Sequence, residues 1–370
     1  MKITEIKTTL LYDPDGFVVQ DATIPPIPSG TKGRSQLFVH IYTDEGTIGL
    51  GMAPGQRAIR EVIHQNLSGV LIGEDPFMIE KLWQDMFWRV RGFGRKGVAF
   101  QAIAAIDIAL WDLKGKILNQ PIYRLLGPAH ESVPIYGSGG WTNYSETELV
   151  AEQTGYVERG IPRVKMKVAK DFGQAEREDI ERLSAVREAV GDDVEIYVDA
   201  NNGYYAKQAI KMSQIFEQFD VAWFEEPVLA DDIPGLAQVS QATTIPVATG
   251  EHEYTKYGFR DLLIAGAVDI VQPDVHRVTG ITEWMKVAAM ADAFNLPVAP
   301  HAVSLVHLHC AMATPNLKVV EVLGAEEQSN SVWWTEVPPY DGGTWRPFAD
   351  RPGLGLEISP DALKHNVIDE

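Results

Sequence analysis

Short apolar runs alternate with longer amphipathic stretches from residue 133 onward. Eight of these runs are rich in valine and isoleucine: Val133–Tyr136, Arg163–Val168, Glu195–Val198, Ala222–Phe224, Pro246–Ala248, Asp269–Gln272, Pro297–Ala299 and Lys318–Val322. Strands that are apolar on both faces are typical of a parallel sheet covered by helices. Eight such strands with helices between them predict a (β/α)₈ TIM barrel, an α/β fold. If three of the runs were loops, the same pattern would give an open α/β sheet.

The residues before this barrel pattern are organised differently. Lys2–Leu11 alternates between polar and apolar positions, as a half-buried strand does, and Leu37–Tyr42 and Thr47–Gly51 flank a turn at residues 43–46. Residues 58–118 carry a helical pattern, and Ala102–Ile117 is apolar enough to form a buried helix. We therefore expect an α+β unit here. The tail at 328–370 loses the strand–helix rhythm, and we expect it to return to this unit.

The charge and the cysteine content exclude several classes of protein. The chain has 370 residues, with 51 acidic and 32 basic side chains and a net charge of −19. Nucleic acids and anionic membranes would repel such a chain, so we expect neither as a partner. Cys310 is the single cysteine, so no internal disulfide can form, which favours a reducing cytoplasm. No apolar run reaches the length of a transmembrane helix, and the N-terminus does not have the pattern of a signal peptide.

Acidic residues follow three consecutive predicted strands. Asp199, Glu225 and Glu251 are separated by equal intervals of 26 residues (199 to 225 and 225 to 251), about one strand–helix unit each. Chemistry in a barrel sits at the carboxyl ends of the strands, so these side chains should meet at one mouth. Two unit charges ~5 Å apart at an effective dielectric of ~20 repel by about 3 kcal/mol, so the three carboxylates need a cation. Oxygen ligands that leave room for water suit Mg²⁺.

Candidate acid/base groups end three other strands. Lys165 and Lys167 are two residues apart on the second strand, so they share a face. At ~6 Å, a charged Lys165 would lower the pKa of Lys167 by roughly two units, provided that a metal neutralises the carboxylates. Asp274 and His301 end the sixth and seventh strands, and an aspartate beside a histidine fixes its tautomer and raises its basicity.

Two other features receive a structural interpretation. His307 and His309 fall on the helix expected after the seventh strand, and we interpret both as structural. Gly92–Gly97 matches the glycine spacing of dinucleotide sites, but no strand precedes it and the acidic partner is missing. We therefore expect a turn before a helix, near the mouth of the barrel, and no nucleotide.

Taken together, these motifs resemble the enolase superfamily and its mandelate racemase subgroup. The resemblance rests on Lys165–Lys167, Val198–Asn201, Phe224–Pro227, Gly250–Glu251, Pro273–Asp274 and Pro300–His301. It implies an α+β capping domain over residues 1–128, a modified barrel over 129–327 and a segment at 328–370 that returns to the cap. It also implies a homo-oligomer, since the subgroup is often octameric.

The resemblance assigns roles to the residues at the mouth. It implies that Asp199, Glu225 and Glu251 bind Mg²⁺, and that Lys167 and the His301–Asp274 pair act as acid/base groups on opposite faces of the substrate. It implies further roles at the mouth for Lys165, which would stabilise the developing charge, for Glu321, which would bond the substrate carboxylate, and for Asn201, which would contact the substrate.

The implied reaction begins with removal of the proton α to a carboxylate. Loss of the 3-hydroxyl would then make the chain an aldonate or aldarate dehydratase, a hydro-lyase of acid sugars. Residues 250–260, with His252 as a further substrate contact, resemble rhamnonate-type dehydratases, but those generally lack the lysine pair, and His276–Gly280 replaces their usual Gly-Gly. The alternatives are a racemase or epimerase of a 2-hydroxy acid or amino-acid derivative, and a non-catalytic metabolite-binding protein.

The long loop Asp13–Arg34 is the candidate for substrate selection. It is rich in proline and glycine, and loops of this length inside a compact domain are often functional. We expect it to close over the mouth, with Phe17, Lys32 and Arg34 touching the far end of the substrate. Trp141, after the first barrel strand, is a further candidate.

Overall fold

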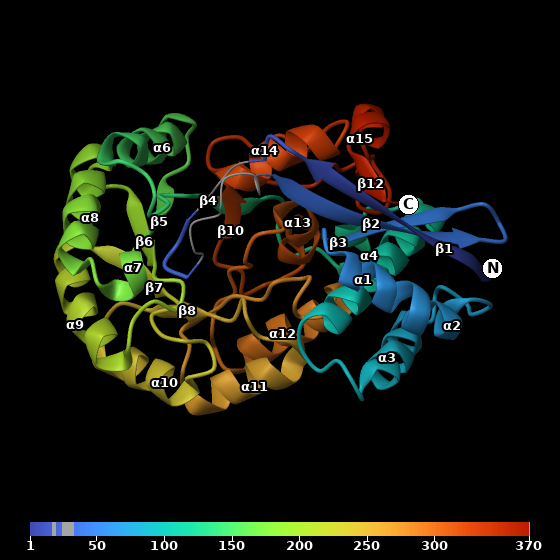
Figure 1. The fold of residues 1–370 in the computed structure, drawn as a ribbon, viewed down its shortest axis with the longest axis horizontal. Coiled ribbons are helices and arrows are strands. Elements are labelled where there is room, and N and C mark those ends of the chain that lie inside the picture. The colour runs from blue at the N-terminus through green and yellow to red at the C-terminus, as the bar shows by residue number, and fades with distance from the viewer. Residues whose placement is uncertain (17–19, 24–32, 370) are drawn as a thin grey trace.

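The computed structural model describes residues 1–16, 20–23 and 33–369. It contains an antiparallel sheet of four strands, ordered β12-β1-β2-β3, and a curled parallel sheet ordered β10-β4-β5-β6-β7-β8-β9, with β11 paired to β4. In Figure 1 the parallel sheet and its outer helices form a crescent on the left, and the antiparallel sheet lies on the right with both chain termini. The α/β barrel-type fold with an antiparallel capping unit is thereby confirmed.

The capping unit combines its sheet with a helical layer. Its strands are β1 (Ile3–Asp13), β2 (Arg34–Thr43), β3 (Ile48–Pro54) and β12 (Val367–Asp369). Its helical segments are α1 (Arg57–Val62), the π-helical η1 (Ile63–Leu67), α2 (Ser68–Leu71), α3 (Ile79–Val90), α4 (Val98–Ile117) and α5 (Ile122–Leu126). The α4 helix packs across β3 and is buried along most of its length, as its apolar sequence predicts.

The barrel strands lie where the apolar runs predict them. They are β4 (Val133–Ser138), β5 (Arg163–Lys167), β6 (Glu195–Asp199), β7 (Val221–Glu225), β8 (Val247–Thr249), β9 (Ile270–Val271) and β10 (Val320–Leu323). The helical segments between and after them are α6 (Glu146–Glu158), the irregular turn α7 (Lys170–Gly173), α8 (Glu176–Val190), α9 (Ala206–Phe216), η2 (Glu217–Phe219), α10 (Ile233–Ala242), α11 (Thr255–Ala265), α12 (Ile281–Ala293), α13 (Ser304–Met312) and α14 (Gly324–Trp333).

The seventh predicted strand is reduced to one residue. Val298 forms parallel bridges to Val271 of β9 on one side and to Leu317, just before β10, on the other. Pro297 and Pro300 flank this position, and proline has no N–H to donate to a sheet. The ring of strands therefore continues through Val298 to β10, which pairs with β4.

Aromatic side chains fill the barrel interior beneath the strand ends. Tyr197 stacks on Trp223 with ring centroids 3.6 Å apart, and Tyr136 meets both rings edge-on at 5.3 and 5.2 Å. All three are fully buried. They give the mouth of the barrel a rigid floor, so the polar residues above them have a packed support.

The cap and the barrel are joined by buried polar contacts. Asp107 of α4 accepts hydrogen bonds from the backbone N–H (3.0 Å) and the hydroxyl (2.6 Å) of Thr282, at the start of α12. Trp83 of α3 donates its indole N–H to the carbonyl of Thr279 at 3.0 Å. Gly280 has φ 101°, and a Cβ there would lie 2.3 Å from an Asp107 carboxylate oxygen. This junction therefore requires glycine.

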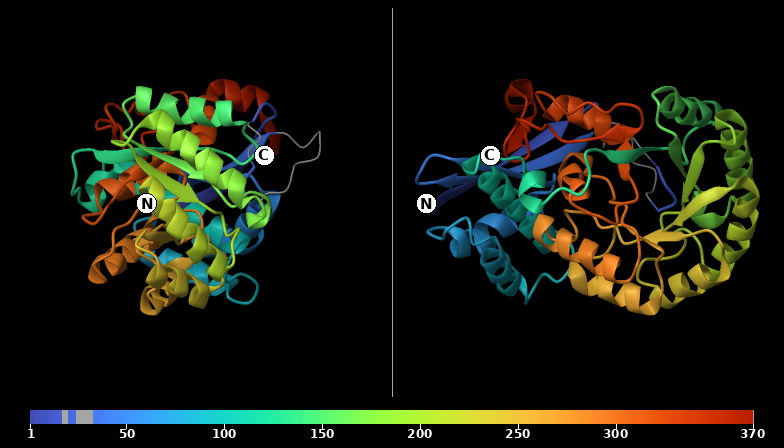
Figure 2. Two further views of the ribbon diagram at one scale, coloured as in Figure 1. Left: turned by 90° about the vertical axis from the view of Figure 1, so that its left-hand side faces the viewer. Right: turned by 180° about the vertical axis from the view of Figure 1, so that it is seen from behind.

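The C-terminal segment contacts both sheets, as the view from behind in Figure 2 shows. The strand β11 (Thr344–Trp345) pairs with β4 of the barrel, and β12, which follows α15 (Pro360–His365), pairs antiparallel with β1 of the cap. The expected return to the cap is thus present, while the exact domain boundaries stay a prediction. Within the described ranges, no helix has the length and apolar character needed to cross a membrane.

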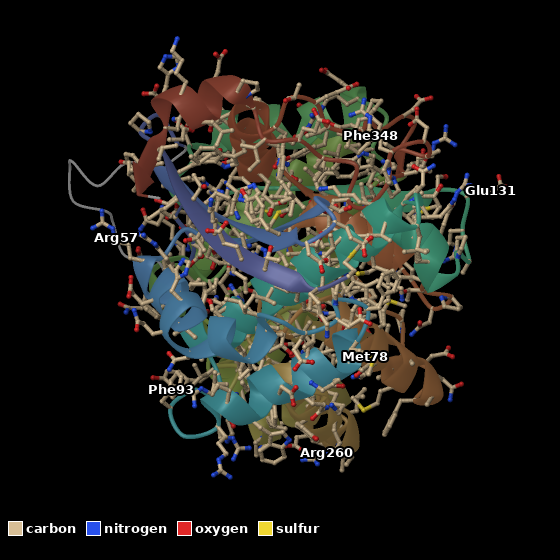
Figure 3. All side chains as sticks on the ribbon, turned by 90° about the vertical axis from the view of Figure 1, so that its right-hand side faces the viewer. Arg57, Met78, Phe93, Glu131, Arg260 and Phe348 are labelled. Atoms are coloured by element: carbon tan, nitrogen blue, oxygen red, sulfur yellow. The ribbon has the colours of Figure 1, made fainter. Side chains whose placement is uncertain are left out.

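The outer surface of the cap carries exposed apolar side chains. Met78 and Phe93, which lie just before and just after α3, are 50% and 57% exposed, and Figure 3 shows both on this face. Single apolar side chains of this kind are normal on a protein surface. The expected homo-oligomer stays a prediction.

Candidate active site

The strand ends bring the predicted polar residues to one mouth. Lys167 lies opposite Asp199 in the register of β5 and β6, and Asp199 lies opposite Glu225 in that of β6 and β7. On β5 the two lysines point into the barrel, while Met166 between them packs in the main hydrophobic core under the helices. The period-2 alternation of a strand therefore places both ammonium groups beside the carboxylates.

Lys165 connects the ends of three strands. Its Nζ lies 2.7 and 2.8 Å from the two oxygens of Glu225, 3.1 Å from Glu321 and 3.6 Å from Asp199, and the side chain has no exposed surface. Burial alone would lower the pKa of Lys165, but Glu225, Glu321 and Asp199 raise it well above its ordinary value. Lys165 is therefore held as an ammonium among three carboxyl groups.

Lys167 faces the mouth one pleat further along β5. Its Nζ pairs with Asp199 and lies 5.2 Å from the centre of the Trp141 ring. Burial and Lys165 lower the pKa of Lys167, but Asp199 and Glu225 together raise it above its ordinary value. The lowered pKa of Lys167 is predicted on condition that a metal neutralises these carboxylates, and on that condition it stays a prediction.

His301 and Asp274 form the expected pair on another side of the mouth. His301 Nδ1 lies 2.9 Å from an Asp274 oxygen, and the other oxygen accepts the backbone N–H groups of His276 at 2.7 Å and Arg277 at 3.2 Å. Burial would raise the pKa of Asp274, but the bond from His301 and the charge of Arg277 hold it well below its usual range. Asp274 is therefore ionised and keeps the His301 proton on Nδ1.

The second nitrogen of His301 faces the carboxylate cluster. Its Nε2 lies 3.4 Å from Glu251. Burial lowers the pKa of His301, but Glu251 and the bond to Asp274 raise it to about 9. His301 can thus hold or release a proton at Nε2, the ring nitrogen that faces Glu251.

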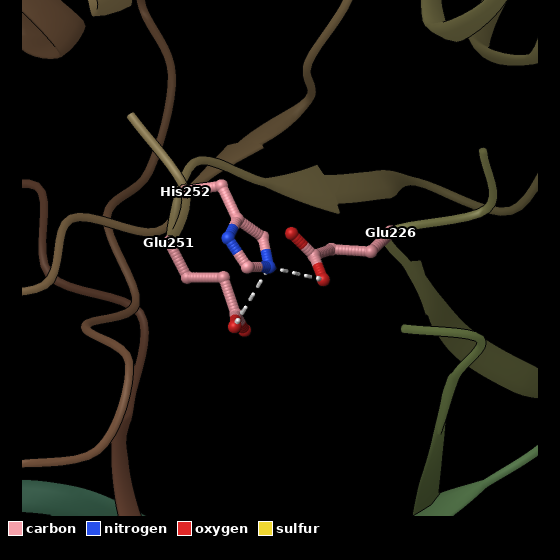
Figure 4. Close-up of side chains that lie close together, drawn as sticks. All are labelled: Glu226, Glu251 and His252. Carbon is pink, nitrogen blue, oxygen red and sulfur yellow. Dashed lines mark ion pairs between the residues drawn. The ribbon is translucent and has the colours of Figure 1, made fainter. Parts of the chain in front are cut away.

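Glu226, Glu251 and His252 make a close group (Figure 4). His252 Nε2 lies 3.5 Å from Glu226 and 3.6 Å from Glu251, and one ligand atom from each residue lies within 4.8 Å of the others. Across the described ranges this is the set of three that is close enough to hold a metal as it stands. Of the predicted ligands, Glu251 belongs to it, whereas Asp199 and Glu225 turn their carboxylates to the two lysines.

Carboxyl groups at the mouth outnumber the lysine and arginine cations, and burial raises the pKa of Glu225 to about 8 and that of Glu226 to about 7. The carboxylates are Asp199, Glu225, Glu226, Glu251, Asp274 and Glu321, and the lysine and arginine cations that contact them are Lys165, Lys167 and Arg277. Arg277 donates to the backbone carbonyl of Glu251 at 2.8 Å and to its carboxylate at 3.1 Å. One carboxylate oxygen of Glu226 is buried without a hydrogen-bond partner. This excess of hard oxygen donors fits a divalent cation such as Mg²⁺.

Two further predicted residues offer polar atoms to a substrate. Asn201 donates its backbone N–H to Asp199 at 2.8 Å, and its side-chain oxygen is buried without a partner. Glu321 accepts the backbone N–H of Ala302 at 2.7 Å. Burial would raise the pKa of Glu321, but Lys165 lowers it to about 2. Glu321 is therefore ionised, and a hydrogen bond from it to a substrate carboxylate would need an added proton.

Only part of the loop Asp13–Arg34, the candidate for substrate selection, can be compared with its prediction. Phe17 and Lys32 lie outside the described residues. Arg34 begins β2 and lines a cavity of about 310 Å³ together with Gln36, Ser304 and Asn330 from both sides of the cap–barrel boundary, and Asp274 reaches the same cavity. Burial lowers the pKa of Arg34. In the part of the chain that the structure describes, no carboxylate forms an ion pair with its guanidinium.

The glycine-rich turn reaches the mouth, as expected. Lys96 lies 3.4 Å from Glu253 and 3.8 Å from Asp231, two residues in loops after barrel strands. The same turn lines a cavity of about 330 Å³ with Asn202 and His252. The half-exposed His252 therefore has open space beside it.

Sequence reasoning missed Glu226 and Arg277 as members of the site. The tandem Glu225-Glu226 was visible, but only one of two consecutive residues on a strand can point into the barrel. Glu226 reaches the mouth because the strand ends at Glu225 and Glu226 takes a positive φ of 39°. Arg277 gave no signal beyond its place in the unusual His276–Gly280 segment.

Comparisons with known proteins agree with this geometry. The family described as enolase C-terminal domain-like matches residues 148–362, and the N-terminal domain of mandelate racemase/muconate lactonizing enzyme matches residues 18–127. The L-talarate/galactarate dehydratase of Salmonella typhimurium is 35% identical over 371 residues, covering 98% of this chain and 90% of that protein. The arabinonate dehydratase of Saccharolobus solfataricus is 36% identical, covering 86% and 87%.

Solved structures agree as well. An L-talarate dehydratase from a Polaromonas species, complexed with Mg and L-glucarate, superimposes with a TM-score of 0.91 at 33% identity and covers 100% of this chain and 98% of that one. A racemase from Streptomyces coelicolor with bound magnesium gives a TM-score of 0.91 at 30% identity, covering 99% and 100%. The chain therefore belongs to the enolase superfamily, in the group of mandelate racemase and muconate lactonizing enzyme.

Proposed function

We propose that this protein is a Mg²⁺-dependent dehydratase of acid sugars, that is, of aldonates or aldarates. One observation carries the proposal: two acid/base groups, Lys167 and the His301–Asp274 pair, approach one carboxylate cluster from different strands. A group on each side can remove a proton from one carbon and deliver a proton to the neighbouring oxygen.

We propose Asp199, Glu225 and Glu251 as the residues that hold Mg²⁺. Their carboxylates are hard oxygen donors, and Glu251 already belongs to the group close enough to hold a metal. The bound ion would stabilise negative charge on the substrate carboxylate while the α-proton leaves. Lys165, which is always charged, adds a second positive charge at the same place.

The residues on either side of the substrate carry out the proton transfers. One of Lys167 and His301, in its neutral form, takes the α-proton, so that the C–H electron pair moves into the carbon skeleton. Mg²⁺ held by Asp199 and Glu251 would offset the negative charge that raises the pKa of both groups. The C3–O bond then breaks, and the other group protonates the leaving hydroxyl, which departs as water. The resulting enol becomes the 2-keto-3-deoxy acid by proton transfer to C3. Asp274 keeps His301 in the tautomer that presents Nε2 to this chemistry.

The relatives support the substrate class, since those named above act on talarate, galactarate and arabinonate, and an L-rhamnonate dehydratase of Saccharopolyspora erythraea is 32% identical. We propose aldarates as the first candidates within it. Arg34 lines a cavity beside Asp274. Glu326, in the same cavity, and Asp13 attract its guanidinium without forming an ion pair with it among the described residues, and a guanidinium binds a second carboxylate better than it binds a terminal hydroxyl. Phe17, Lys32, Trp141, His252 and Asn201 remain candidates for further substrate contacts.

A second candidate function keeps the same first step. The structural relative from Streptomyces coelicolor is called a racemase, and a relative from Agrobacterium fabrum is a D-galactarolactone cycloisomerase at 33% identity. Reprotonation of the same carbon from the opposite face would give racemisation without loss of water. Exchange of the α-hydrogen with solvent deuterium, without dehydration, would favour racemisation as the function.

The direct test is a library of acid sugars that pairs each aldarate with its aldonate. The protein is incubated with Mg²⁺, and the 2-keto-3-deoxy product is measured. We expect turnover of at least one aldarate, loss of activity on chelation, and no turnover in Lys167→Ala or His301→Asn. If no acid sugar is turned over by the folded, Mg²⁺-bound protein, the proposed function is wrong.

A further inference from the structure

Two histidines lie in α13, directly after the loop that carries His301. His307 and His309 are buried, with 0% and 1% of their surface exposed. Both have a pKa of about 4, because burial disfavours the charged ring. Both are therefore neutral at working pH, and each ring can offer one donor and one acceptor.

The ring of His307 joins the two loops of the catalytic pair. Its Nε2 accepts the backbone N–H of Val275 at 2.9 Å, and its Nδ1 donates to the backbone carbonyl of Ala302 at 2.5 Å. Val275 is the residue after Asp274, and Ala302 is the residue after His301. A single side chain thus bonds the neighbours of both members of the pair.

The backbone at this point needs such support. Ala302 and Val303 both have φ 45°, a left-handed conformation that residues with a side chain rarely adopt. Strained backbone persists only where the surroundings over-determine it. Here Glu321 accepts the N–H of Ala302, and His307 donates its Nδ1–H to the carbonyl of Ala302, so both polar groups of the residue after His301 are held.

We propose that His307 is a positioning residue that sets the distance and orientation between His301 and Asp274. The inference rests on the proposed function, in which this pair moves a proton. The neighbouring contacts point the same way: Trp284 packs against the His307 ring at 6.0 Å and donates to the carbonyl of Pro273 at 3.3 Å. The hydrogen bond between His301 and Asp274 therefore depends on a ring whose own hydrogen bonds go to the backbone beside them.

His309 supplies a matched control on the same helix. Its Nδ1 accepts the backbone N–H of Tyr123 at 3.3 Å, and its Nε2 donates to the carbonyl of Leu354 at 3.1 Å. The burial, the neutral state and the number of bonds match those of His307. Its partners, however, belong to α5 and the C-terminal segment instead of the catalytic pair. A purely structural role would make the two histidines equivalent.

The experiment compares His307→Leu and His307→Gln with His309→Leu and His309→Gln. Thermal stability, kcat, KM and the pH profile of kcat are measured with the acid sugar that the wild type turns over best. We expect similar losses of stability at both positions. His307→Leu should lower kcat on the order of 100-fold with KM nearly unchanged, because a displaced catalytic group costs about that factor. His307→Gln should recover part of kcat, since an amide can both donate and accept.

A crystal structure of each variant gives a readout that needs no substrate. We expect the 2.9 Å bond between His301 and Asp274 to persist in the His309 variants and to be broken in His307→Leu. Equal kcat values in His307 and His309 variants of equal stability, with the bond intact, would overturn the proposal. If a leucine variant does not fold, the two glutamine variants decide the question. If the wild type turns over no acid sugar, the proposed function fails while the crystal structures still test the positioning role.

Discussion

The carboxyl group of Asp107 should make the stability of this protein depend on pH. Asp107 is fully buried in α4 at the junction between the cap and the barrel. Burial raises its pKa from 3.8 to about 7, against the two hydrogen bonds from Thr282. Asp107→Asn removes the charge and keeps an acceptor. We therefore predict that the unfolding free energy of this variant increases, relative to that of the wild type, as the pH rises.

The sign and the size follow from proton linkage. The folded pKa lies above the unfolded one, so the folded state binds the proton more tightly. The stability contribution is complete below about pH 4 and is lost as the pH rises through 7. A difference of about three pKa units corresponds to about 4 kcal/mol.

The assay is denaturant unfolding of wild type and Asp107→Asn between pH 5 and pH 8, followed by tryptophan fluorescence. The difference in unfolding free energy between the two proteins should grow by about 1.4 kcal/mol per pH unit up to about pH 7 and then level off. Asp261→Asn, at a 52% exposed side chain on α11, controls for the loss of one negative charge. A difference that is the same at every pH would refute the reasoning, because Asp107 would then be ionised throughout.

Three further predictions concern the strand ends and the cap junction. Replacing Lys165 by methionine leaves buried carboxylates without their cation. Lys165→Met should therefore lose about 3–5 kcal/mol of stability in thermal unfolding, together with all turnover. Unchanged stability would contradict the buried ion cluster. Mg²⁺ at a hundredfold excess over its Kd should stabilise the folded protein by about 2.7 kcal/mol in the same assay, and Glu225→Gln should abolish most of that gain. Gly280→Ala adds a Cβ 2.3 Å from Asp107 at φ 101° and should cost about 2–5 kcal/mol. Gly266→Ala, with φ 59° and no heavy atom within 4 Å of the added Cβ, should cost only about 1 kcal/mol; equal losses in the two variants would argue against the clash.

Local pattern was enough to predict the strands and the edge on which the site lies. Each barrel strand is a short apolar run that buries both faces, and this property is visible within a few residues of sequence. The equal spacing of Asp199, Glu225 and Glu251 follows from the repeat of one strand and one helix. Because parallel strands carry their carboxyl ends to the same edge, the sequence alone determines that these acids gather with Lys167 and His301.

The partners of each charged group were decided by the tertiary structure. Whether Glu225 pairs with Lys165 or with a neighbouring acid depends on distances of a few ångströms between strands that are far apart in sequence. The same holds for the pKa of Lys167, where Asp199 outweighs Lys165, and for His307, whose ring bonds two loops. Electrostatic and hydrogen-bond energies change steeply over such distances, whereas a pattern of residue types carries no information about them. Sequence therefore determined most of the groups at the mouth, with Glu226 and Arg277 as the exceptions, and packing determined which group each one bonds.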